Sequence, residues 1–209
     1  MTHRPVLTPT ATWVLLAALL LPGCTVRSFI YPVPGVEVGT PPTGFEEIDL
    51  PLTRGIRAVG WHHPGPESST RPPLIFFHGN GENLETLKWG GLYDQLLSLD
   101  SPLLVVDYPG YGRSTGQPSE QSLKNTADEA LKWMEDQYPD RPIVPCGWSL
   151  GAALAVHLGR LGPPRVQGLI AISSWTSLKA VAEIHFPSWL VGVGLRETYD
   201  SLGVADQIE

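Results

Sequence analysis

Basic residues are scarce in this chain of 209 residues and do not occur in runs. Lys and Arg together number 14 against 21 Asp and Glu, which gives a formal net charge of −7 at pH 7. A protein that binds a phosphate backbone carries a basic patch or stripe. We therefore expect no nucleic-acid partner.

Cysteine is also scarce, because Cys24 and Cys146 are the only two in the chain. So few cysteines provide no disulfide framework, and we expect no disulfide. Cys146 ends an apolar run, where a lone cysteine is usually a small buried side chain. The cysteines and histidines show none of the spacings typical of metal ligands, so no metal site is predicted.

A long apolar run is missing as well. The longest run near the N-terminus covers residues 13–21 and follows His3 and Arg4 in an acid-free segment. As a helix it would rise about 14 Å, against about 30 Å for the hydrocarbon core of a bilayer. A charged start, a short apolar region and an exit of small residues are typical of a cleaved export signal.

The segment Leu-Pro-Gly-Cys at residues 21–24 resembles the processing box of bacterial lipoproteins, although Pro22 departs from the usual small residue. The resemblance implies a signal peptide at residues 1–23 and acylation of Cys24, which would anchor the protein to a membrane of the bacterial cell envelope without spanning it. A plain secretory signal, giving a secreted or periplasmic protein, and a short core helix remain the alternatives. Residues 24–44, rich in Pro and Gly, are predicted to be a tether.

The rest of the chain, residues 45–209, is expected to form one α/β domain. Alternating residues at 45–52 and 56–61 around a turn predict an antiparallel hairpin. Apolar runs without alternation suit strands buried on both faces, and they occur at 74–77, 103–106, 143–146 and 166–172. A helix with one apolar stripe begins near Ser119. The pattern predicts a doubly wound, mostly parallel sheet preceded by the hairpin.

The motif Gly-Trp-Ser-Leu-Gly at residues 147–151 carries the main chemical signal. It stands between a predicted strand and a predicted helix, and a serine in such a turn is presented above the sheet as a nucleophile. The flanking glycines permit a strained backbone. The helix N-terminus directs N–H groups toward a developing oxyanion, with Leu150 as the first donor. The alternative for Ser149 is a tight turn in a nonhydrolytic domain.

Two further loops follow predicted strands. The segment His-Gly-Asn-Gly-Glu-Asn at 78–83 is expected to supply a second oxyanion donor from the N–H of Asn80, and the segment Asp-Tyr-Pro-Gly-Tyr-Gly-Arg-Ser occupies 107–114. Together with the serine motif, in this order, they resemble the α/β-hydrolase superfamily, in particular its serine aminopeptidase-like and monoacylglycerol-lipase-like branch. The resemblance covers roughly residues 45–205.

The resemblance implies a serine hydrolase of the esterase, lipase or peptidase kind, with Ser149 as nucleophile, oxyanion donors at Asn80 and Leu150, no cofactor, and a small ester, acyl or peptide substrate. It also implies that a triad acid and histidine follow the serine in that order. Only His157 and His185 follow Ser149. His157 would lie about 12 Å down the helix, and His185 falls in a segment where such hydrolases place a lid.

The family's acid and histidine normally follow the segment that resembles residues 196–209, so we expect the chain to lack the C-terminal part of the domain. An incomplete triad leaves two alternatives to an active enzyme. One is a noncatalytic lipoprotein that binds an acyl or aromatic ligand. The other is an inactive truncated fragment with exposed sheet edges.

Overall fold

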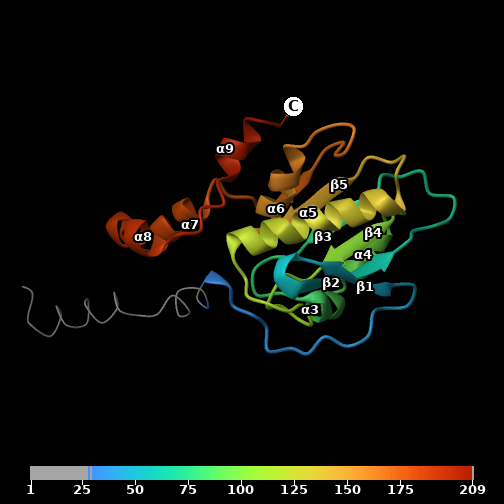
Figure 1. The fold of residues 1–209 in the computed structure, drawn as a ribbon, viewed down its shortest axis with the longest axis horizontal. Helices are drawn as coiled ribbons and strands as arrows, with labels where there is room; N and C mark the ends of the chain where they lie inside the picture. The colour runs from blue at the N-terminus through green and yellow to red at the C-terminus, as the bar shows by residue number, and fades with distance from the viewer. Residues whose placement is uncertain (1–27, 29, 209) are drawn as a thin grey trace, which may run out of the picture. The chain divides into compact units, whose positions relative to one another are not determined.

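The computed structural model describes Ser28 and residues 30–208. By internal contacts it divides into a first unit of residues 1–32 and a second of residues 33–209, and the second unit contains the whole sheet (Figure 1). The predicted signal peptide and Cys24 lie outside the described residues. None of the described helices is both long enough and apolar enough to cross a membrane.

The predicted hairpin is confirmed. Strand β1 (Glu46–Pro51) and strand β2 (Arg57–His63) pair antiparallel, with Ile48 opposite Gly60. The connecting turn is the 3₁₀ helix η1 (Thr53–Gly55). β2 then pairs antiparallel with strand β4 (Leu103–Val106), which joins the hairpin to the parallel part of the sheet.

The remaining strands are parallel. β3 (Leu74–Phe77), β4 (Leu103–Val106), β5 (Val144–Trp148) and β6 (Ile170–Ile172) complete a six-stranded sheet with the order β1-β2-β4-β3-β5-β6. This confirms the predicted α/β class. β6 is shorter than the apolar run at 166–172, because Val166 makes an isolated bridge to Ile143 and regular pairing resumes only at Ile170.

Helices cover both faces of the sheet. Alternate residues of the buried strands, such as Leu74 and Phe76, pack in one apolar cluster with Leu84, Leu87 and Leu96; these last three come from α3 (Leu84–Trp89) and α4 (Leu92–Leu97). Helices α5 (Glu120–Gln137) and α6 (Leu150–Gly159) lie side by side on the sheet (Figure 1). The chain continues through α7 (Leu178–His185), α8 (Ser188–Gly194) and α9 (Ser201–Ala205).

The helix predicted near Ser119 has the expected start. The Ser119 hydroxyl accepts a hydrogen bond from the backbone N–H of Ser122, and the Ser122 hydroxyl accepts one from the N–H of Ser119, which forms a capping box. Leu123, Ala127, Ala130, Leu131 and Met134 are buried along one side. The apolar stripe read from the sequence is therefore the face that covers the sheet.

Candidate active site

The register of the parallel strands brings three loops to one edge of the sheet. Phe77 pairs with Val106 on one side and with Gly147 on the other. The residues that follow these positions, beginning at His78, Asp107 and Trp148, therefore emerge side by side at the carboxyl edge. Ligands of open α/β sheets bind at that edge.

Ser149 occupies a strained turn between β5 and α6. Its φ of 50° and ψ of −114° lie outside the regions that side-chain-bearing residues normally adopt. The turn is held by a 2.9 Å hydrogen bond from the Ser149 N–H to the carbonyl of Ile172 in β6. The serine residue is partly exposed.

The two glycines of the motif are required by close packing. A Cβ at Gly151 would overlap the carbonyl groups of Phe77 and His78, and a Cβ at Gly147 would overlap the backbone of Gly151. The start of α6 therefore lies directly against the loop that follows β3. The serine turn is therefore in contact with the segment that leads to Asn80.

The two expected oxyanion donors come from these two segments. Leu150 is the first residue of α6, and an N–H at that position has no partner within its own helix. Asn80 lies in the turn after β3 with its side chain fixed, since the Tyr111 hydroxyl donates a 2.9 Å hydrogen bond to Asn80 Oδ1. Their assignment as donors stays a prediction.

Gly79 is held at both of its backbone polar groups. Its N–H donates to Glu82 Oε2 at 2.7 Å, and its carbonyl accepts a hydrogen bond from His78 Nδ1 at 2.8 Å. The Gly79 carbonyl and the Asn80 N–H belong to one planar peptide group. Fixing the carbonyl therefore also fixes the direction of the Asn80 N–H.

His78 is itself held by a buried carboxyl. Its Nε2 lies 3.3 Å from Asp107 Oδ1, and both side chains are fully buried. Burial raises the pKa of Asp107, while His78 and the hydrogen bond from the Leu84 N–H act in the opposite direction. Nδ1 donates to the Gly79 carbonyl, and Nε2 faces the Asp107 carboxyl. His78 is therefore placed as a support of the loop, with its ring fully buried between the Gly79 carbonyl and Asp107.

The other described histidines are engaged elsewhere or exposed. His157 Nε2 lies 2.9 Å from Asp128 Oδ1, His62 lies between Glu46 and Tyr138, and His63 accepts a hydrogen bond from the Gly65 N–H. His185 is exposed at the end of α7. No histidine of the described chain forms a hydrogen bond with Ser149.

The sequence prediction missed two residues of this site. Glu82 Oε2 accepts a hydrogen bond from the indole N–H of Trp148 at 2.8 Å, in addition to that from Gly79. Glu82 and Trp148 are 66 positions apart in the chain, so no local pattern marks them as partners. The only signal in the sequence was that Glu82 and Trp148 each lie within one of the predicted motifs.

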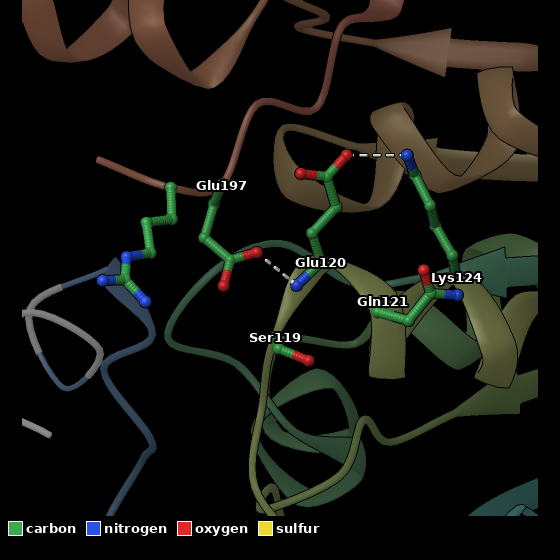
Figure 2. Close-up of a pocket in the computed structure, with 6 residues that line it drawn as sticks. Ser119, Glu120, Gln121, Lys124 and Glu197 are labelled. Atoms are coloured by element: carbon green, nitrogen blue, oxygen red, sulfur yellow. Dashed lines mark hydrogen bonds and ion pairs between the residues drawn. The ribbon is translucent and has the colours of Figure 1, made fainter. Parts of the chain in front are cut away.

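A cavity of about 260 Å³ lies away from this site, at the N-terminus of α5 (Figure 2). Its walls include Glu120, Lys124 and Glu197, whose charged groups are mostly engaged with one another or with backbone. Neither Ser149 nor the expected oxyanion donors line it. Within the described residues no group of three or more His, Cys, Asp or Glu side chains is placed to bind a metal, and Cys146 is free and buried in β5.

Comparison with known proteins agrees with this geometry. A family model described as the alpha/beta hydrolase fold matches residues 72–193. An uncharacterized protein of Mycobacterium tuberculosis is 36% identical over 138 residues, which are 65% of this chain and 47% of that protein. A pimeloyl-[acyl-carrier protein] methyl ester esterase of Edwardsiella ictaluri is 34% identical over 142 residues, 64% of this chain and 50% of the esterase.

Among solved structures, an esterase of Pyrococcus furiosus superposes with a TM-score of 0.64 at 18% identity, covering 85% of this chain and 74% of the esterase chain. At that identity the match supports the fold. The chain spans about half the length of the curated relatives it matches.

Proposed function

Since this chain belongs to the α/β-hydrolase fold family, we propose that it is a serine hydrolase that cleaves small carboxylic esters through an acyl-enzyme on Ser149. The observation that carries the proposal is the strained turn at Ser149, packed against the loop that contains Asn80. Unfavourable backbone conformations of this kind cost about 1–3 kcal/mol and cluster at functional sites.

In the proposed reaction the Ser149 hydroxyl oxygen forms a bond to the carbonyl carbon of the ester, and its proton passes to a base. The carbonyl oxygen becomes an oxyanion that accepts hydrogen bonds from the N–H groups of Leu150 and Asn80. The C–O bond to the alcohol then breaks and the alcohol leaves with a proton. Water hydrolyses the acyl-serine, which releases the acid and restores the hydroxyl.

Ester substrates are favoured over peptides by the relatives with a named activity. The protein from Edwardsiella ictaluri is named for methyl ester hydrolysis, and the superposed Pyrococcus furiosus protein is an esterase. An ester also needs less help from a general acid, because an alcohol leaves more easily than an amine. This matters here, where the described residues place no histidine against Ser149.

The test is labelling of the full chain with a fluorophosphonate, compared with the Ser149→Ala variant. A single label that disappears in Ser149→Ala, together with hydrolysis of short p-nitrophenyl esters, is the expected result. Ester turnover at equal rates in both proteins would contradict the proposal. Binding of acyl chains without labelling would instead favour a noncatalytic ligand-binding protein. That alternative is supported by the finding that no described histidine forms a hydrogen bond with Ser149.

We also propose that Cys24 is the lipid-bearing residue that anchors the protein to the cell envelope. This proposal is supported by the sequence alone, in which an export-type segment is followed by Leu-Pro-Gly-Cys at residues 21–24. Expression in a bacterial host with a labelled fatty acid tests it. Incorporation of label into wild type but not into Cys24→Ser is expected, and an unlabelled, soluble wild-type protein would contradict the anchor.

A further inference from the structure

The Glu82 carboxylate joins the two halves of the candidate site. Its Oε2 accepts one hydrogen bond from the Gly79 N–H at 2.7 Å and another from the Trp148 indole N–H at 2.8 Å. Gly79 belongs to the loop that presents the N–H of Asn80, and Trp148 directly precedes the nucleophile. One oxygen atom therefore bridges the donor loop and the serine turn.

The packing around this bridge is tight. A Cβ at Gly79 would overlap the Trp148 indole nitrogen and would come within 2.9 Å of Glu82 Oε2. Glycine is thus the only residue that fits between the carboxylate and the indole. The loop glycine, the acid three residues later and the tryptophan before the serine form one contact, which we call the Glu82 bridge.

The bridge acts on Gly79, the residue whose carbonyl shares a peptide group with the Asn80 N–H. His78 holds the Gly79 carbonyl, and Glu82 holds the Gly79 N–H, so this residue is fixed on both sides. Hydrogen bonds to a carboxylate are shorter and roughly twice as strong as those between neutral groups. Within the described residues, both hydrogen bonds that Glu82 accepts belong to the bridge.

We propose that Glu82 is a positioning residue of this hydrolase, which holds the Asn80 N–H at the correct distance from the Ser149 hydroxyl by tying Gly79 to Trp148. The inference rests on the proposed function for its catalytic consequence. The carboxylate does not contact the substrate. It sets the separation of the oxyanion donors, which come from two loops that share no covalent connection near the site.

The kinetic test compares Glu82→Ala, Glu82→Gln and Trp148→Phe with wild type. Displacement of a catalytic group by about 1 Å costs on the order of 100-fold in rate. We expect Glu82→Ala to lower the maximal rate of Ser149 phosphonylation by about 10- to 100-fold, with less than a threefold change in the half-saturating inhibitor concentration. Glu82→Gln keeps an acceptor oxygen and should recover part of the loss. Glu67→Ala, at an exposed loop residue, is the matched control.

A double-mutant cycle tests whether the two contacts act together. Trp148→Phe removes the indole N–H and keeps an aromatic ring. Because the bridge needs both partners, Glu82→Ala should add little to the loss already caused by Trp148→Phe. Rate losses that multiply would show two independent effects and would overturn the bridge as a unit.

Proton–nitrogen NMR of the full chain separates this inference from the proposed function. In Glu82→Ala the Gly79 amide and one of the seven tryptophan indole resonances, the one absent from Trp148→Phe, should both move upfield. An unmoved indole resonance, or wild-type labelling rates in Glu82→Ala, would overturn the inference. Wild-type protein that fails to label while both resonances move would refute the proposed hydrolase and leave Glu82 as a structural tie between the two loops.

Discussion

His78 Nε2 and Asp107 Oδ1 lie 3.3 Å apart in a fully buried pair beneath the candidate oxyanion loop. The same carboxyl oxygen accepts a 3.0 Å hydrogen bond from the N–H of Leu84, the first residue of α3. Through His78, the carboxyl supports the Gly79 carbonyl. Asp107 therefore connects the loop after β4 to the loop after β3 and to the start of a helix.

The first prediction concerns this pair. Asp107→Asn keeps the size of the side chain but replaces the buried carboxyl that lies against His78 Nε2 and accepts the Leu84 N–H. Breaking a buried pair by removing one partner typically costs about 3 kcal/mol or more, so we expect a loss of that order in the free energy of unfolding, measured in urea. Asp49→Asn, in an exposed pair with Arg57, should change stability by less than about 1 kcal/mol.

The second prediction concerns the contact between α6 and the loop after β3. Gly151→Ala would place a methyl group against the Phe77 and His78 carbonyls. Overpacking of this kind costs about 1–3 kcal/mol, and the displaced helix start should also abolish labelling of Ser149. Gly168→Ala is the control, because nothing lies within 4 Å of its added Cβ. A fully active Gly151→Ala protein would contradict the packing.

The third prediction concerns the strain at Ser149. With a φ of 50°, this position favours glycine, and relief of the strain should exceed the entropic cost of glycine. Ser149→Gly should therefore raise the free energy of unfolding by about 1 kcal/mol while removing all reactivity. Ser98→Gly, at an ordinary φ of −63°, should destabilise. A Ser149→Gly protein less stable than wild type would show that the backbone at Ser149 is not strained.

The fourth prediction is a pH dependence at Glu120, in the cavity of Figure 2. Partial burial by itself raises the pKa of Glu120, but Lys124 and the backbone N–H groups of Thr198 and Tyr199 hold it below the usual 4.5. A carboxyl with a depressed pKa in the folded state stabilises the fold above its unfolded pKa, and this stability is lost as the pH falls through the folded value.

Glu120→Gln should therefore lower the free energy of unfolding by about 1.5 kcal/mol at pH 7, the lower end of the range for a hydrogen bond to a charged group. The difference from wild type should shrink as the pH falls below 4.5, the usual pKa of a glutamate. Thermal melts between pH 3 and pH 7, with the exposed Glu67→Gln as control, provide the measurement. An equal difference at every pH would show that the charge of Glu120 is irrelevant.

Several parts of the fold and of the site were predictable because local pattern determines them. The hairpin follows from alternation, α5 from its apolar stripe and the cap at Ser119, and the serine turn from two glycines between a strand and a helix. Burial of Cys146 agrees with the interpretation of a lone cysteine in an apolar strand. In each case the signal lies in residues that are neighbours in the chain.

The sequence by itself determined the α/β class and the position of the Ser149 turn, because hydrophobic period and turn chemistry are local. Only the tertiary structure decided that β4 lies between β2 and β3, that Asp107 supports His78, and that Glu82 contacts Trp148. Those contacts depend on strand order and register. A single hydrogen bond between residues far apart in the chain leaves no periodic trace in a sequence, so it is found only when the sheet brings the loops together.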